Sequence, residues 1–259
     1  MVLSIRVGDA EIVLEDAGAG RPILLLHGFP ASRQLWAGVA PALAELGFRV
    51  LVPDLVGYGA LDAPVGVRVD MASQARWMLE LLDVLDIQRV VLVAHDVGSA
   101  AAQLMLCEAP ERVAALVILD GVYRAEWAMD AIASIRAWNP CDAHRLFAVL
   151  IRRLCKSEAM RAVLAPYEGG QGGLRLIRAA KDLDPAQTEH ICETLRAKRV
   201  PALVLWGEQD RYLPIDTVAQ PLAELLDAPL CLLPGGHFTP TDCPEAVVAA
   251  LRDFLPRIR

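Results

Sequence analysis

Short apolar runs alternate with longer stretches of helical periodicity along most of the chain. Unbroken apolar runs of strand length occur at Ile23–Leu26, Val90–Ala94 and Val113–Leu119. Such runs are typical of strands that are buried on both faces of a parallel sheet. Apolar residues recur at helical spacing between these runs, for example over Met71–Leu85. The alternation predicts an α/β fold, in which a mostly parallel sheet is covered by helices on both faces.

Turn and capping residues place the remaining elements. Two alternating segments around Gly8-Asp9 predict an N-terminal hairpin. Ser32 is expected to cap a helix that runs to Leu46 and ends at Gly47. Further strands are predicted at 49–52, 202–206 and 230–233, and further helices at 98–108, 215–226 and 245–255.

The strand rhythm disappears between Gly121 and about Leu183. This stretch is helical in pattern, with expected breaks at Asn139-Pro140 and at the glycine run 168–173. It predicts a helical cap inserted after the sixth strand. The chain would then divide into an α/β core of residues 1–120 and 184–259 and a cap of residues 121–183.

Composition narrows the class of protein. The chain has 259 residues, 55% of them hydrophobic, which is enough for a large core. No window approaches the ~18 consecutive apolar residues of a membrane span, and no signal peptide is recognisable. The net charge of −7 argues against nucleic acid as a partner. The six cysteines are widely spaced and form no metal-binding pattern, so we expect a cytoplasmic protein with reduced thiols.

The stretch from Val90 to Ala102 carries the strongest chemical signal. A β-branched apolar run stops at Asp96 and is followed by small residues that open a helix. Ala94, Gly98 and Ser99 supply the small neighbours that a sharp strand-to-helix turn requires. This is the shape of a nucleophile elbow, in which the turn pushes one side chain out of the backbone. The usual nucleophile there is Ser, whereas this chain has Asp.

Three further motifs follow predicted strands. They are the segments His27-Gly28-Phe29-Pro30, Trp206-Gly207-Glu208-Gln209-Asp210 and Gly235-Gly236-His237-Phe238. In open α/β sheets, sites form at the carboxyl ends of strands, so all three are expected to meet the elbow at one rim. The chain order is nucleophile, acid, histidine, as in α/β-hydrolases.

From about Ile23 to the C-terminus the chain resembles the α/β-hydrolase superfamily. The Asp at the elbow is similar to the branch that contains epoxide hydrolases, haloalkane dehalogenases and fluoroacetate dehalogenases. The resemblance implies that Asp96 attacks an electrophilic carbon and forms an ester, which water activated by His237 then hydrolyses. It also implies an oxyanion hole made by the backbone N–H groups of Phe29 and Val97, with His27 shaping that loop. No cofactor or metal is expected.

The physics of an Asp nucleophile supports this reading. A carboxylate is already ionised at neutral pH, and the positive end of the following helix favours that charge further.

Two acids are candidates for the carboxylate that orients His237. Asp210 follows a late strand, and Asp120 ends the strand before the cap. Asp210 is favoured, and His95 is interpreted as a packed neighbour of the elbow rather than a base.

The chain departs from each subgroup of the branch. Val97 stands where haloalkane dehalogenases have a halide-binding Trp, and residues 97–103 lack the arginines by which fluoroacetate dehalogenases hold a carboxylate. Ile177 stands where epoxide hydrolases often have a cap tyrosine. The remaining cap candidates for a proton donor or substrate contact are Tyr123, His144 and Tyr167.

Four functions stay open at this point. An epoxide hydrolase working through an Asp96 ester is favoured, ahead of a dehalogenase of the same branch. An ester or lactone hydrolase would need Asp96 in a non-nucleophilic role, and a non-catalytic member would keep the rim as a binding pocket. The expected partner is a small molecule, and the oligomeric state is left open.

The predicted cap has an excess of basic residues. It carries ten Lys and Arg against six Asp and Glu. A basic lid of this kind could steer an anionic substrate.

Overall fold

The computed structural model describes residues 1–258 and contains one eight-stranded sheet in the order β1-β2-β4-β3-β5-β6-β7-β8. β2 pairs with β1 and β4 in antiparallel fashion, and all the other pairings are parallel. This architecture confirms the predicted fold class. The strands are β1 (Val2–Val7), β2 (Ala10–Gly18), β3 (Arg21–Leu26), β4 (Phe48–Pro53), β5 (Val90–His95), β6 (Val113–Leu119), β7 (Ala202–Gly207) and β8 (Leu230–Leu233).

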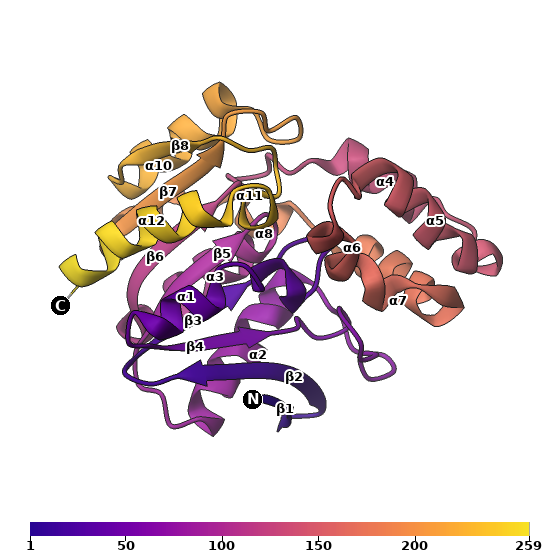
Figure 1. Cartoon of the computed structure of the whole chain (residues 1–259), viewed down its shortest axis with the longest axis horizontal. Coiled ribbons are helices and arrows are strands. Elements are labelled where there is room, and N and C mark those ends of the chain that lie inside the picture. Colours follow the sequence, from indigo (N-terminus) through magenta and orange to yellow (C-terminus); the bar gives the residue numbers. More distant parts are fainter. Residues whose placement is uncertain (259) are drawn as a thin grey trace.

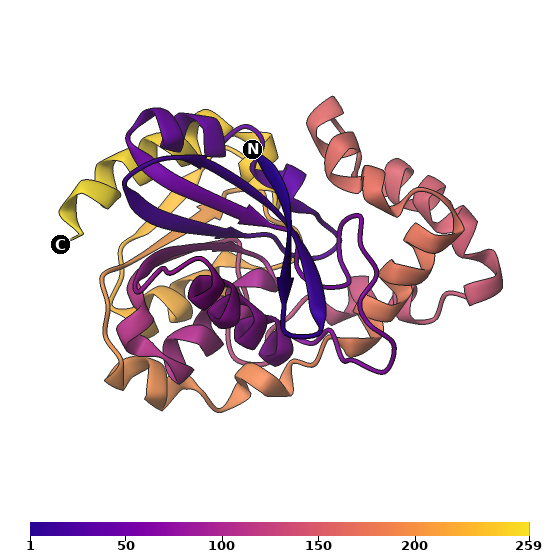
Figure 2. The same ribbon diagram turned by 90° about the horizontal axis from the view of Figure 1, so that it is seen from below.

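Helices cover both faces of the sheet. The helices α1 (Ala40–Glu45) and α12 (Pro244–Phe254) lie on one face, and α2 (Met71–Val84) and α3 (Gly98–Glu108) lie on the other (Figures 1 and 2). Every residue of β5, β6 and β7 is buried, which explains their continuous apolar sequences. The shorter helices of the core are α8 (Ala186–Glu189), α9 (Cys192–Ala197), α10 (Gln220–Leu226) and α11 (Thr239–Asp242).

The helix expected from Ser32 to Leu46 is interrupted. A 3-10 turn covers Arg33–Trp36, and α1 begins only at Ala40. Pro41 lies in the first turn of α1, and a continuous helix would lose the hydrogen bond that a residue at this position normally donates. The Ser32 hydroxyl caps no helix, because it donates to the carbonyl of Val163 at 2.9 Å.

Residues 121–183, which we call the helical segment, contain four α-helices. They are α4 (Met129–Arg136), α5 (Ala143–Leu154), α6 (Glu158–Leu164) and α7 (Gly169–Asp182), and both views place them together at one end of the sheet (Figures 1 and 2). The assignment of this segment as a separate domain stays a prediction.

The expected break falls at the start of the glycine run, where Glu168 is extended and Gly169 has a φ of 79°, whereas Gly170–Gly173 lie within α7. A side chain on Gly172 or Gly173 would collide with backbone atoms. A Cβ there would lie 2.5 Å from the carbonyl carbon of Tyr167 or 2.1 Å from the carbonyl oxygen of Ala143. The glycines therefore serve close packing of α7 against its neighbours, rather than a turn.

Several polar contacts attach the helical segment to the core. The Tyr167 hydroxyl donates to the carbonyl of Ala31, and Arg175 forms an ion pair with Asp62 at 3.0 Å. Within residues 1–258, no helix combines the length and the apolar character that crossing a bilayer requires.

Candidate active site

The elbow places Asp96 in a backbone conformation that few side chains adopt. Asp96 follows β5 directly, has a φ of 51° and precedes α3, which begins at Gly98. A Cβ on Gly28 would lie 2.4 Å from the Asp96 Cβ, and one on Gly98 would lie 2.3 Å from the His27 carbonyl oxygen. Both glycines are therefore needed for the loop after β3 to approach the elbow, as the sequence motif predicted.

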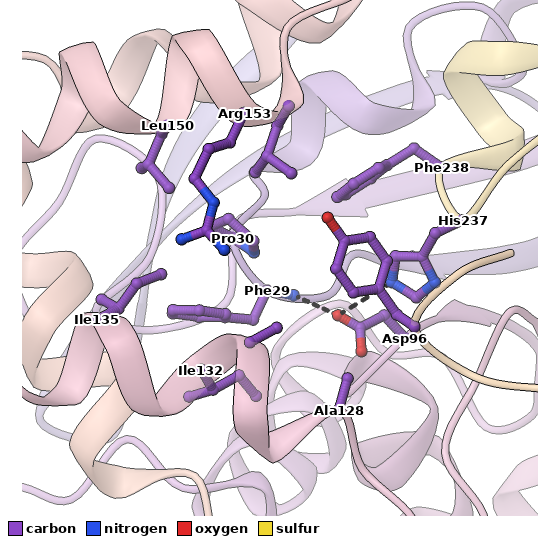
Figure 3. Close-up of a pocket in the computed structure, with 13 residues that line it drawn as sticks. Phe29, Pro30, Asp96, Ala128, Ile132, Ile135, Leu150, Arg153, His237 and Phe238 are labelled. Carbon is purple, nitrogen blue, oxygen red and sulfur yellow. Dashed lines mark hydrogen bonds and ion pairs between the residues drawn. The ribbon is translucent and has the colours of Figure 1, made fainter.

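The Asp96 carboxylate is buried between two polar partners. Its Oδ2 atom accepts a hydrogen bond from the Phe29 backbone N–H at 3.0 Å and lies 3.8 Å from His237 Nε2 (Figure 3). The backbone N–H of Val97 has no hydrogen-bond partner in the described part of the chain. One of the two amides expected to form an oxyanion hole thus already holds the carboxylate, and the other is unengaged.

The His27 side chain is part of the frame of this loop. Its Nε2 accepts from the Leu55 backbone N–H at 3.0 Å, so its Nδ1 carries the proton and donates to the Gly28 carbonyl at 2.9 Å. Burial lowers the pKa of His27 further toward the neutral form. Both ring nitrogens are occupied, which leaves His27 to shape the loop rather than to transfer protons.

His237 lies between two carboxylates. Its Nδ1 is 2.9 Å from Asp210 Oδ2, while the other oxygen of Asp210 accepts the backbone N–H groups of Tyr212 and Leu213 at 2.8 and 3.2 Å. The loop after β7 therefore holds the carboxylate still. With Nδ1 donating to Asp210, Nε2 is the ring nitrogen that faces Asp96.

These contacts set the charges. Burial by itself would lower the pKa of His237, but the hydrogen bond to Asp210 and the charges of Asp210 and Asp96 outweigh it and raise the pKa well above its usual value. Burial opposes ionisation of Asp96 as well, yet His237 and the Phe29 N–H lower the pKa of that carboxyl. Both shifts favour the charged forms of the pair, a carboxylate on Asp96 and an imidazolium on His237.

His95 supports the imidazole from behind. Its Nε2 lies 2.7 Å from the His237 carbonyl oxygen, and the two rings are 5.1 Å apart. Burial, followed by the charge of His237, lowers the pKa of His95 to about 4, so it is neutral and donates this bond. It contacts the backbone of His237 and is a packed neighbour of the elbow, as expected.

The second candidate acid, Asp120, is not brought to the imidazole. Its carboxyl accepts hydrogen bonds from the Gly207 backbone N–H at 2.6 Å and from the Thr239 hydroxyl. Burial raises the pKa of Asp120 to about 8. The carboxyl is therefore protonated at neutral pH and links the ends of β6 and β7 to α11.

A small cavity of about 60 Å³ opens in front of Asp96 and His237. At roughly 10–15 Å³ per water, this volume suits a small organic group. Its walls are mostly apolar, and the helical segment supplies one side of them from α4 and α5 (Figure 3). The apolar lining includes Phe29, Pro30, Ala128, Ile132, Leu150 and Phe238.

Two polar residues of the cavity were missed by the sequence reading. Tyr212 comes from the loop after β7, and its ring packs edge-on against the His237 ring at 5.1 Å. Its position two residues after Asp210 was the available signal. Arg153 projects from α5 toward Pro30 (Figure 3). Only the excess of basic residues in the helical segment pointed to it.

The three candidates named in the predicted cap do not line this cavity. Tyr167 is buried, and its hydroxyl donates to the Ala31 carbonyl and accepts from the Gly59 N–H. His144 is exposed at the start of α5 and faces a surface groove on the outer side. Tyr123 forms a backbone bridge with Glu126. None of the three contributes to the lining of this cavity, and a donor role for these positions stays a prediction.

No group of three or more His, Cys, Asp or Glu side chains is placed to hold a metal ion among the residues that the structure describes. The polar groups at the site are the Asp96 and Asp210 carboxylates, the His237 imidazole, the Tyr212 phenol and the Arg153 guanidinium.

Comparison with known proteins agrees with this geometry. Residues 21–146 match the family model described as alpha/beta hydrolase fold. A haloalkane dehalogenase of Mesorhizobium japonicum is 26% identical over 98% of this chain and 91% of its own length. A fluoroacetate dehalogenase of a Burkholderia species is 38% identical over 120 residues, which are 45% of this chain and 39% of that relative.

The similarity extends to solved structures. An alpha/beta hydrolase fold protein from Burkholderia ambifaria is 25% identical, with a TM-score of 0.78, over 98% of this chain and 100% of that chain. The similarity therefore covers nearly the whole chain, at about 25% identity.

Proposed function

We propose, from the premise that the chain belongs to the alpha/beta-hydrolase fold superfamily, that it hydrolyses a small molecule through a covalent ester on Asp96. The observation that carries the proposal is the chain of contacts from Asp210 through His237 to Asp96, which ends in a small apolar cavity. We infer epoxide opening as the reaction.

The first step uses the free oxygen of the carboxylate. Phe29 N–H holds Oδ2, whereas Oδ1 of Asp96 accepts no hydrogen bond from the described residues. Oδ1 attacks a ring carbon of the epoxide, a carbon–oxygen bond forms to Asp96, and the carbon–oxygen bond of the ring breaks. The departing oxygen needs a proton, which the imidazolium of His237 supplies, and His237 becomes neutral.

The second step follows from the change in charge. Ester formation removes the negative charge of Asp96, and with it one of the causes that raise the pKa of His237. The neutral imidazole then takes a proton from water, and the hydroxide attacks the ester carbonyl. The Phe29 and Val97 N–H groups hold the developing negative charge, as an oxyanion hole does. Release of the diol restores the carboxylate and the imidazolium.

The raised pKa of His237 supports an epoxide. Epoxide opening consumes a proton at the departing oxygen, which a protonated His237 supplies. Loss of a halide consumes none, so a protonated His237 in a dehalogenase would have to lose its proton to solvent before it could activate water. In addition, no tryptophan is among the described residues that line the cavity.

Carbon–halogen hydrolysis is the second candidate. It is supported by the names of two relatives, a haloalkane dehalogenase and a fluoroacetate dehalogenase. It would use the same Asp96 ester and the same hydrolysis step. The cytoplasmic location stays a prediction.

A single turnover in heavy-oxygen water tests the proposal. We expect small epoxides to give an unlabelled diol in the first turnover and label in the Asp96 peptide, because water attacks the ester carbonyl. The matched haloalkanes are offered in parallel to separate the two candidates. Turnover that places the label in the product and none in the peptide would contradict an ester on Asp96 and favour direct attack by water.

A further inference from the structure

A second cavity adjoins the first on the side of His237. It has a volume of about 390 Å³ and lies between the α5–α6 connection and the loops that carry Tyr212 and His237. Arg153, Tyr212 and His237 line both cavities. We call this second space the basic chamber, because Arg153, Lys156 and Arg211 line it. A molecule in the chamber can therefore extend past Arg153 toward Asp96.

The three cations of the chamber have no carboxylate within 4.0 Å in the portion of the chain that is described. Arg153 makes one long contact with the Ser134 hydroxyl at 3.3 Å. The chamber contains one acid, Asp242, whose Oδ2 accepts the Gly236 backbone N–H at 2.9 Å. Three positive charges thus face the chamber against one negative charge.

Three other arginines of the helical segment are engaged in contacts. Arg175 pairs with Asp62 and Arg178 donates to the carbonyl of Pro64, both in the core, whereas Arg136 donates to the carbonyl of Ala180 within the helical segment. These contacts hold the helical segment together and against the core. Arg153 and Lys156 have no comparable partner, although they come from the same segment, so their charge remains available to a ligand.

We propose, on the basis of the Asp96 ester mechanism, that the substrate carries a terminal anionic group that binds in the basic chamber against Arg153. The reactive carbon then lies in the inner cavity beside Asp96. The planar guanidinium can donate two hydrogen bonds to a carboxylate or a phosphate. The apolar walls of the inner cavity accommodate the carbon skeleton. Arg153 is in this role a specificity-determining residue.

Charge gives a reason for the arrangement. An anionic substrate approaches a chain with a net charge of −7 and must come close to the Asp96 carboxylate. A local group of cations at the mouth of the site reverses that unfavourable potential and raises the rate of encounter. Arg153, Lys156 and Arg211 are all exposed, so salt should reduce the contribution of this field.

The experiment uses three matched epoxides that end in a carboxylate, a phosphonate or a neutral primary amide. We expect kcat/KM to be higher for at least one acid than for the amide, and the better acid identifies the anionic group. In Arg153→Gln the acid-to-amide ratio should fall about tenfold to hundredfold, mainly through KM, since a hydrogen bond to a charged group is lost. Arg153→Lys should retain part of the ratio because it keeps the charge.

Arg152→Gln is the matched control. Arg152 is the neighbouring residue of α5, is exposed and lines the outer groove instead of the chamber, so its replacement should leave the ratio unchanged. An acid-to-amide ratio at or below one, or the same ratio in wild type and Arg153→Gln, would overturn the inference. If the Asp96 peptide still becomes labelled in heavy-oxygen water, the ester mechanism survives that result; if no epoxide labels it, both fail.

Discussion

The ends of β5 and β6 place two aspartates in nearly the same backbone setting, yet the two differ in charge. Asp96 and Asp120 each follow their strand directly, have positive φ values of 51° and 42°, and are buried. The pKa of Asp96 lies below its usual value, and the pKa of Asp120 is raised to about 8. A strained turn at a strand end therefore does not by itself make a nucleophile.

Their partners account for the difference. Asp96 lies 3.8 Å from His237 Nε2 and accepts the Phe29 N–H, and together these overcome the cost of burial. Burial dominates at Asp120, where the charge of His237, which makes no direct contact, and the dipoles of Gly207 N–H and the Thr239 hydroxyl do not outweigh it. One carboxyl is kept reactive, and the other becomes a protonated link that holds the loops around His237.

Replacing each aspartate by Asn should show the largest difference between the two in turnover rate. Asp96→Asn removes the nucleophile, and we expect turnover to fall by on the order of 10⁴-fold or more, with no ester formed. Asp120→Asn keeps the shape of a neutral group and should stay within about tenfold of wild type. Steady-state rates and the mass of the Asp96 peptide measure both. Equal losses in the two variants would break the comparison.

His237→Gln should make the ester on Asp96 observable, because the variant lacks the base that activates water in the second step. Ester formation needs no base, whereas its hydrolysis does, so the ester should accumulate and turnover should fall about 10²–10⁴-fold. Mass spectrometry of the intact protein after mixing with substrate shows the adduct. A variant that converts substrate without any detectable adduct would argue against Asp96 as the nucleophile and His237 as the base of ester hydrolysis.

Lowering the pH should act on the same step without a mutation. Asp96 stays ionised because its pKa is lowered, but His237 must be neutral to activate water. As the pH falls through the pKa of His237 in the ester, we expect the rate of ester hydrolysis to decrease about tenfold per pH unit. Quenched-flow sampling should show the ester fraction rising as the pH falls. An ester fraction independent of pH would count against His237 as the base.

The smallest effect concerns the stability of Asp120→Asn. The unfolded carboxyl loses its proton near pH 3.8 and the folded one near pH 8, so its stabilising contribution is complete below 3.8 and is lost progressively as the pH rises to about 8. Asn has no proton to lose. The melting temperature of the variant relative to wild type should therefore increase by several degrees across this range. A constant difference would mean that Asp120 is ionised in the folded protein.

Local signals predicted the core of the site well. Gly98 after Asp96 and Gly28 before Phe29 each mark a close approach that a side chain would block, whereas the nearest neighbours of Gly235 and Gly236 are side-chain atoms at 3.0 Å and beyond. Because parallel strands end at one rim, chain order was enough to bring these loops together. The fold and the position of the elbow could be predicted for that reason.

The helical segment was predicted less well. Its helices were recognisable, but Gly172 and Gly173 indicated a break where the structure has close packing. Tyr167 was a candidate for chemistry and is a buried contact to Ala31, whereas Arg153 had no signal of its own and lines both cavities. Which face of a helix meets a site depends on how the helix is docked, and docking is made by many weak contacts between distant segments.

The sequence by itself determined the succession of strands and helices along the chain, the sharp turn at Asp96 and the three loops that meet there, because these depend on burial patterns and on local backbone limits. Only the tertiary structure decided the order of strands in the sheet, that Asp210 rather than Asp120 contacts His237, and that the pKa is lowered for Asp96 and raised for Asp120. The physical reason is that a buried carboxyl takes its charge from the groups around it, and those groups come from parts of the chain that are far apart in sequence.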